Sequence, residues 1–409
     1  MIRKENTNNK KLIRLIRTLG PGIITAALVF GPGSLTIASK LGAGFQYQLL
    51  WVVILITFFM AVFTIMSARI GVSSEKTLVT LIREKYGKVF SIISGLGVFL
   101  VTVSFQSGNA IGAGLAFAEL FNTSIKPWII LFSCLAISLL FLKTFYKILE
   151  KVMIVMIAVM ILSFLVTLIL SGPEIMAMVK GFIPAIPSGS ELLTIALVAS
   201  SFSVVGAFYQ SYLVQERGWK KQEIKSCQYE SLTGIIILGM ITFMIMSAAG
   251  SVLFPKGIQV NSAAEMGKAL EPLFGNFASS VFMVGLFAAS FSSLLGNATL
   301  GGAVLGDALS LGNKLSAMPL RVLIMVVIVI GATFAVAFSH LQLNLIVLAQ
   351  AITMIVAPII GVFILLISIN DTIMGDLKIS RTLKALGIIG LIIILLLGIG
   401  FVYLFLFQK

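Results

Sequence analysis

A break lies in the middle of an apolar stretch near the start of the chain. The segment VFGPGSLTIAS (29–39) places Gly31, Pro32 and Gly33 inside a hydrophobic run, with Ser34 directly after them. Glycine and proline interrupt helices, and an interrupted helix leaves backbone N–H and C=O groups free. Gly31 and Gly33 let a ligand approach that backbone closely, and we expect Ser34 to be the N-cap of the following helix. Such a break can bind a small solute or ion through dipoles.

A second interruption of the same kind lies farther along the chain. The segment LVASSFSVVGAFYQSYLVQERGW (197–219) contains a serine cluster with Ser200 and Ser203, followed by Gly206. Paired interruptions in two apolar segments are the best sequence pointer to the central binding site of a transporter. The alternative interpretation is structural: Gly-Pro kinks the first segment, and Gly206 permits close helix packing.

The composition places these breaks in a membrane protein. The chain has 409 residues, of which 59% are hydrophobic and only 11% charged, and its mean hydropathy is +1.11. Soluble proteins are about 45–50% apolar and about 25% charged. Segments of spanning length recur along the whole chain. We predict eleven spans, at 19–41, 47–70, 89–118, 127–146, 149–171, 190–214, 229–254, 276–305, 319–339, 342–369 and 383–407.

The distribution of charge predicts the orientation of these spans. With a cytosolic N-terminus, 23 of the 29 Lys and Arg residues fall on the cytosolic side, as the positive-inside rule requires. The net charge of +14 is therefore an orientation signal beside anionic lipid rather than a nucleic-acid footprint. We predict a multi-pass protein of the cell membrane with an extracytoplasmic C-terminus. Its expected partners are the lipid bilayer and a small solute or ion, with no nucleic acid.

The two breaks also predict the internal organisation. They lie five spans apart, and an odd offset gives the two segments opposite orientations, as in an inverted repeat. No phosphate-binding loop, His/Cys ligand cluster or central pair of carboxylates occurs in the sequence, so we expect neither an enzyme nor a cofactor. The predicted regions are a cytosolic basic tail (1–18), a first five-helix repeat (19–171), an extracytoplasmic loop (172–189), a second five-helix repeat (190–369), and a cytosolic loop with helix 11 (370–409).

Several stretches resemble a known family. LGPGIITAALVFGPGS (19–34) and LGAGFQYQLLWVVILITFFMAVFTIMSARIGV (41–72) are similar to the start of the Nramp (natural resistance-associated macrophage protein) family. The similarity continues in SYLVQERGW, GLFAASFSSLLGNATLGG and LAQAITMIVAPII. Members are proton-coupled divalent metal transporters with the leucine-transporter fold. The resemblance thus implies an all-α secondary transporter, with a 5+5 inverted repeat and broken helices 1 and 6.

The resemblance also implies a metal site, but this chain departs from the family pattern. The family has Asp-Pro-Gly-Asn in helix 1, where this chain has Gly31–Ser34, so both side-chain ligands are changed and the carboxylate is missing. The family's Met-Pro-His in helix 6 corresponds to Ser203–Val205, so the thioether is missing as well. The usual ligands of a transition metal are therefore absent.

The proton route implied by the family is neutral here too. Its acidic helix-3 positions correspond to Gln106 and Asn109, and its second helix-6 histidine corresponds to Gln210. One family position persists, the helix-10 glutamine, which matches Gln350. Gln106 and Asn109 share a helix face, so an interhelical hydrogen bond is the ordinary alternative to a functional role.

The expected central site consists of dipoles, with Gly31, Gly33, Ser34, Ser200, Ser203, Gly206 and Gln350 as candidates. A dehydrated divalent cation needs compensating charge, which carboxylates normally supply. All fifteen acidic residues fall toward span ends, with Glu230 and Asp307 toward the cytosol.

In helix 8, Ser292, Ser293 and Asn297 are candidates for a coupling ion or for helix packing. Three functions remain open: a divalent metal transporter with an atypical neutral site, a transporter of an amino acid or other small organic solute, and a non-transporting sensor.

Overall fold

The computed structural model describes residues 20–142, 144–312 and 314–407, and within these ranges the chain forms helices and turns with no strand. Helices are expected because a chain in lipid must satisfy its backbone hydrogen bonds internally. The long helices are α4 (Leu50–Ser73), α6 (Lys88–Phe121), α8 (Phe145–Ser171), α12 (Ile224–Val252), α13 (Ala263–Ala308), α14 (Met318–Ala337), α15 (Gln342–Ser368) and α17 (Arg381–Phe407). The shorter elements are α5 (Leu78–Tyr86), α7 (Ile125–Leu140), α9 (Ile175–Lys180), α16 (Asp371–Met374), η1 (Lys221–Glu223), η2 (Phe254–Lys256), η3 (Ser339–Leu341) and η4 (Gly375–Leu377).

The number of spans is close to the prediction but does not confirm it. In the described ranges, nine helical segments are long and apolar enough to cross a bilayer, and one bent pair brings the number to ten. The predicted span that remains, 127–146, corresponds to α7, which has 16 residues and ends at Leu140. The structure also places helices inside two predicted loops. Helix α9 lies within 172–189, and α13 begins at Ala263, inside the segment between the predicted spans 229–254 and 276–305. Gly275 interrupts α13 with a φ of 78°, a conformation that glycine adopts readily.

The first predicted break is present. Helix α2 (Pro21–Val29) and helix α3 (Pro32–Phe45) meet at an angle of 62°, with Phe30 and Gly31 extended between them. Pro32 takes the first position of α3, where its fixed φ suits the helix and its missing N–H costs no hydrogen bond. Gly31 is consequently the N-cap. The expectation that Ser34 is the N-cap was wrong, because Ser34 is already the third residue of α3.

The second break is also present, a few residues before Gly206. Helix α10 (Glu191–Ser201) ends before Phe202, and helix α11 (Val204–Arg217) begins after Ser203. The Ser203 side chain caps α11, because its Oγ accepts a hydrogen bond of 3.0 Å from the Gly206 N–H. The serine therefore terminates the break, and Gly206 lies in the first turn of the new helix.

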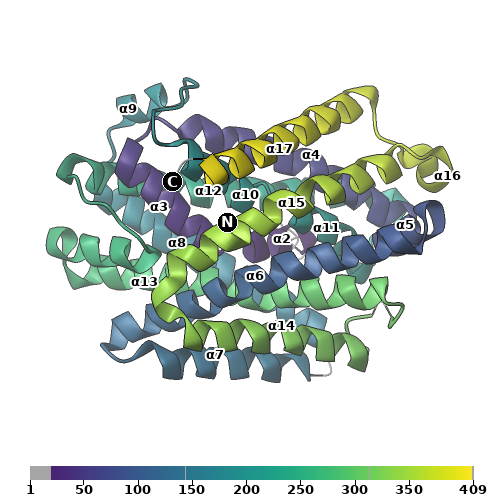
Figure 1. The fold of residues 1–409 in the computed structure, drawn as a ribbon, viewed down its shortest axis with the longest axis horizontal. Coiled ribbons are helices and arrows are strands. Elements are labelled where there is room, and N and C mark those ends of the chain that lie inside the picture. Colours follow the sequence, from purple (N-terminus) through teal and green to yellow (C-terminus); the bar gives the residue numbers. More distant parts are fainter. Residues whose placement is uncertain (1–19, 143, 313, 408–409) are drawn as a thin grey trace, which may run out of the picture.

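The broken helices lie in the middle of the bundle. All nine residues of α2 are buried, and α2 packs against α8, α11, α12 and α13. The long helices α6 and α13 run beside each other, with α7 and α14 along one flank and α17 beside α15 on the other (Figure 1). Small residues permit the closest approach: a Cβ on Gly234 would lie 2.0 Å from the Gly22 carbonyl oxygen, so α2 and α12 touch through their backbones.

Candidate functional site

A small cavity lies where the two breaks meet. Its volume is about 30 Å³, which is room for roughly one water molecule or one desolvated ion. Its walls come from α2, α3, α6, α10, α11, α13 and α15, so it draws on both predicted repeats. The lining residues are Leu28, Val29, Gly31, Gly33, Ser34, Val101, Phe105, Asn109, Ala199, Ser200, Ser203, Val205, Asn297, Leu300 and Thr353.

Most of the predicted site residues line this cavity. Both breaks contribute: Gly31, Gly33, Ser34, Ser200 and Ser203 are all in its wall. Gly206 is not, but its N–H fixes the Ser203 hydroxyl. A Cβ on Gly206 would lie 2.6 Å from Val29 Cγ2, so this glycine keeps α11 close to the end of α2.

Helix α13 supplies donors to the end of α2. The last carbonyls of any helix have no partner within that helix. Here the Ala27 carbonyl accepts from Ser292 Oγ at 2.9 Å and from Ser293 Oγ at 3.2 Å, and the Leu28 carbonyl accepts from Asn297 Nδ2 at 3.1 Å. The single proton of Ser292 Oγ has a second acceptor, the Ala289 carbonyl at 3.1 Å, and the Leu28 oxygen, with one side-chain donor, keeps a lone pair beside the cavity.

The two amide residues on α6, Gln106 and Asn109, have different positions. Gln106 is buried, and its Nε2 donates to the Leu294 carbonyl at 2.9 Å, so it links α6 to α13. Asn109 lies one turn later in the cavity wall, and its Nδ2 is 3.4 Å from Gln106 Oε1. A Cβ on Gly31 would lie 3.0 Å from both Asn109 Oδ1 and Ser293 Oγ. Glycine at this position therefore lets the amide oxygen of Asn109 reach the break.

The other two predicted glutamines lie outside the cavity wall. Gln210 on α11 accepts from Thr25 Oγ1 at 2.5 Å and donates to Ser231 Oγ at 2.9 Å, so it ties α11 to α2 and α12. Gln350 on α15 is fully buried, and within the described residues neither its Oε1 nor its Nε2 has a hydrogen-bond partner. A buried amide without partners costs free energy. Gln350 can therefore accept or donate further hydrogen bonds, and it lies one turn before Thr353 on the same helix.

Two polar residues of the cavity wall were not in the predicted site. Asn297 had been weighed as a coupling-ion or packing residue, and Thr353 lies on the helix face of Gln350, one turn later. Their signal in the sequence was a polar side chain among other polar side chains of a mainly apolar helix. That signal is common to packing residues and to binding residues, so it did not separate them.

The donor set of the cavity is neutral. Its polar atoms are hydroxyl, amide and backbone oxygens, and no carboxylate, imidazole or thiol lines it. Across the described residues, no group of three or more His, Cys, Asp or Glu side chains is placed to hold a metal ion. Oxygen dipoles of this kind suit hard cations better than soft ones.

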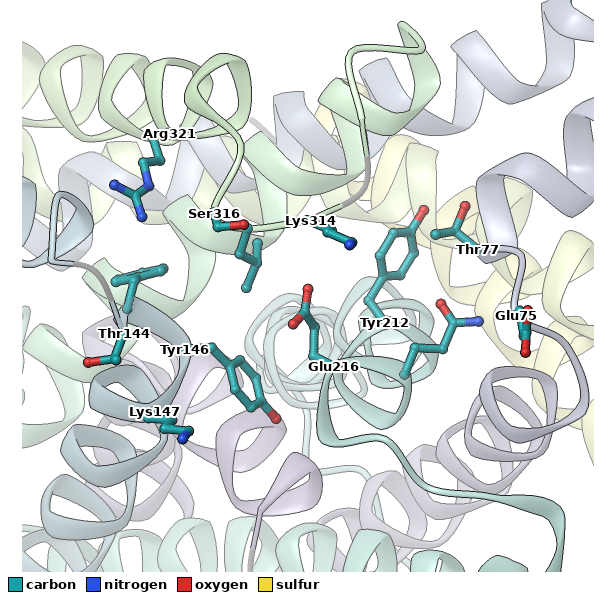
Figure 2. A pocket seen from close by; sticks show the side chains of 13 residues that line it. Glu75, Thr77, Thr144, Tyr146, Lys147, Tyr212, Glu216, Lys314, Ser316 and Arg321 are labelled. Atoms are coloured by element: carbon teal, nitrogen blue, oxygen red, sulfur yellow. The ribbon is translucent and has the colours of Figure 1, made fainter.

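A larger vestibule of about 470 Å³ lies at one end of the bundle, where α5, α8, α11 and α14 meet. Figure 2 shows the Glu216 carboxylate near the middle of this space, with Lys314 above it. The hydroxyl end of Tyr212 turns toward Thr77 at its edge. Val205 and Tyr212 belong to the same helix, α11, and line the cavity and the vestibule respectively. Seven residues of helix, about 10 Å, therefore separate the two spaces.

Comparisons with known proteins agree with this architecture. The model of the natural resistance-associated macrophage protein-like family, Nramp, matches residues 22–404. A divalent metal cation transporter, MntH, of Yersinia pestis is 25% identical over 408 residues, which cover 97% of each chain.

Solved structures share the fold. A manganese transporter from Eremococcus coleocola superposes with a TM-score of 0.80 and 20% identity, covering 95% of this chain and 86% of that one. The nucleobase-cation-symport-1 family transporter Mhp1 superposes with a TM-score of 0.62 and 16% identity, covering 94% of this chain and 92% of the other. The fold is thus the leucine-transporter-like arrangement that the sequence predicted.

Proposed function

Since this chain belongs to the Nramp family, we propose that it is a secondary transporter that carries a divalent metal ion by alternating access through the cavity between its two helix breaks. The observation that supports this most directly is the position of the cavity. Both interrupted helices end at it, and transporters with discontinuous helices bind their substrate at such a junction. MntH of Yersinia pestis and the Eremococcus coleocola protein are metal transporters, and a volume of about 30 Å³ suits an ion.

The proposed ligands are neutral oxygens. Ser34 Oγ, Asn109 Oδ1, Ser203 Oγ and the free lone pair of the Leu28 carbonyl all belong to residues of the cavity wall. Affinity for divalent cations falls as carboxylate ligands are removed, and selectivity for soft metals falls when a thioether is lost. We therefore expect weak binding that favours hard ions, with Gln350 joining the ligands in another conformation.

The positive-inside distribution supports the orientation. We infer that the N-terminus is cytosolic and the C-terminus extracytoplasmic, with 19–171 and 190–369 as the two inverted repeats. The vestibule then opens to the cytosol, because it is lined by the starts of α8 and α14 and the end of α11. In this arrangement α2 and α11 are the inner halves of the two broken helices, and α3 and α10 are the outer halves.

A small organic acid or amino acid is the second candidate. The first N–H groups of α3, at Gly33 and Ser34, have no partner within the helix and lie at the cavity, where they would suit a carboxylate. The volume is against it, because about 30 Å³ holds no amino acid in this conformation. The metal ion therefore remains the proposed substrate.

One screen separates the candidates. Purified protein is tested for thermal stabilisation by Mg²⁺, Mn²⁺, amino acids and organic acids, and then for their uptake into liposomes. We expect metal uptake that saturates in the millimolar range, as for sites with few charged ligands. Micromolar Mn²⁺ affinity would contradict the neutral site. Amino-acid uptake would establish the second candidate, and binding without uptake would indicate a sensor.

A further inference from the structure

Two carboxylates are buried among the residues that the structure describes, and neither is in the central cavity. Glu230 on α12 is 4% exposed and Asp307 on α13 is 5% exposed. Hydrogen-bond donors of the described residues contact both groups. Burying a carboxylate is costly unless it is fully hydrogen-bonded, so the partners of these two indicate what the charge is for.

Glu230 holds the beginning of α2. Its Oε1 accepts from the Gly20 N–H at 2.7 Å and from the Gly22 N–H at 2.9 Å, and its Oε2 is 3.0 Å from the same Gly22 nitrogen. Pro21 between them has no N–H. One carboxylate thus satisfies the free donors at the start of the helix, where the helix dipole also favours negative charge. The Gly22–Gly234 contact brings α2 and α12 close enough for these bonds.

Asp307 holds α11 in a comparable way. Its Oδ2 accepts from Tyr212 Oη at 2.6 Å and from Thr77 Oγ1 at 2.5 Å, and its Oδ1 is 3.3 Å from Thr80 Oγ1. Arg83 fixes the same end of α13, because its Nη2 donates to the Asp307 and Ala308 carbonyls at 2.7 and 2.8 Å. The hydroxyl of Tyr212 is therefore bonded to Asp307 of α13, and through that carboxylate it is linked to Thr77 at the start of α5. Tyr212 and Thr77 both line the vestibule (Figure 2).

The side-chain hydrogen bonds that attach α3, at the opposite end, are weaker. On α3, Thr36 Oγ1 accepts from the Ala263 N–H at 3.2 Å, and the Lys40 ammonium is 3.3 Å from Asn261 Oδ1 at an exposed position. Hydrogen bonds to buried charges are stronger than neutral or exposed ones. The attachment of α2 and α11 is thus stronger at the vestibule end than that of α3 at the opposite end.

We propose that Glu230 and Asp307 are the two latches of the gate between the vestibule and the central cavity. Each holds one half-helix, α2 or α11, and these half-helices separate the two spaces. Gln210 joins the halves, since it accepts from Thr25 on α2. Both carboxylates are positioning residues: they touch no substrate and set how often the cavity opens to the vestibule. The proposal rests on the transporter function above, but its test needs no substrate.

The test measures access to the cavity from each side of the membrane. Val29→Cys, in a background with Cys134→Ala and Cys227→Ala, reports the cavity wall by its rate of labelling with a membrane-impermeant maleimide in liposomes. Lys147→Cys, at an exposed position of the vestibule, identifies the side onto which the vestibule opens. Glu230→Gln and Asp307→Asn are expected to raise the labelling rate from that side about fivefold, the shift that weaker neutral hydrogen bonds produce. Labelling from the opposite side should not rise.

Matched controls keep the result interpretable. Glu223→Gln makes the same chemical change at the N-cap of α12 and should alter the rate less than twofold. Tyr212→Phe removes a single donor to Asp307 and keeps the buried ring, so it tests the second latch even if Asp307→Asn fails to fold. Tyr209→Phe is its control, because it removes a buried tyrosine hydroxyl from the same helix, one turn earlier. Rates unchanged from the control, or raised equally from both sides, would overturn the proposal whatever the substrate is.

Discussion

The central cavity and the vestibule end of the half-helices differ in whether they contain carboxylates. The cavity has hydroxyl, amide and carbonyl oxygens and no carboxylate, whereas two carboxylates are buried where α2 and α11 are attached. Where α2 and α11 are attached, donors of the chain itself satisfy the buried charges, as Gly20, Gly22 and Tyr212 do. A carboxylate in the cavity would instead depend on the bound ion for compensation. The comparison therefore assigns charge to the gate and neutral dipoles to the substrate.

We expect the largest effect from disrupting the backbone contact between α2 and α12. Gly234→Ala places a Cβ 2.0 Å from the Gly22 carbonyl oxygen, so α2 must leave α12. We expect a loss of about 3 kcal/mol in the free energy of unfolding, at the upper end of the cost of overpacking. Gly33→Ala at the cavity is the matched change, because its nearest neighbour is Ile346 at 3.7 Å, and it should leave stability within about 0.5 kcal/mol. Thermal melts in detergent measure both, and equal losses would contradict the packing described here.

Charge can also be added to the cavity. Gly31→Asp combined with Ser34→Asn supplies a carboxylate and an amide at the junction, and should raise Mn²⁺ affinity about tenfold or more, equal to about 1.4 kcal/mol. A Cβ at position 31 meets Asn109 Oδ1 and Ser293 Oγ at 3.0 Å, so Ser293→Ala is included to make room. Titration calorimetry measures the affinity. Unchanged binding would show that these positions do not face the ion, and Ser293→Ala alone is the control.

The smallest effect is expected from a single hydroxyl. Ser34→Ala removes one proposed ligand and should weaken metal binding about fivefold, the value of one ordinary polar contact. Ser39→Ala is the matched control on the same helix, since Ser39 is buried away from the cavity and its Oγ has no partner within the described residues. Metal affinity is measured for both variants. An equal loss in Ser39→Ala would assign the effect to α3 as a whole rather than to a ligand.

Local signals in the sequence predicted much of this arrangement. The run from Gly31 to Gly33 marks its break unmistakably, because glycine and proline act on the backbone where they stand. The second break was placed at the serines and Gly206, and the structure ends α10 at Ser201. The N-cap was wrong because Pro32, not Ser34, decides where α3 begins. Local chemistry thus indicated that breaks occur, but packing determines the residues at which the helices end and begin.

Contacts between distant helices were the part that the sequence could not provide. Asn297 and Thr353 reach the cavity through the packing of α13 and α15 around the breaks, and the polar residues near them in the chain did not distinguish this from helix packing. Glu230 looked like a residue at a cytosolic span end. Its burial depends on the start of α2, which is more than 200 residues away, so hydropathy along α12 alone could not reveal it.

The claim that an ion binds to neutral oxygens at the junction of the breaks can be tested directly with a crystal structure soaked in millimolar Mn²⁺ and recorded at the manganese edge. We predict an anomalous peak between α3, α6 and α11, within coordination distance of Ser34 Oγ and Asn109 Oδ1, which disappears at micromolar Mn²⁺. A peak confined to Glu216 or Glu75 in the vestibule, or an empty junction at millimolar metal, would contradict the account.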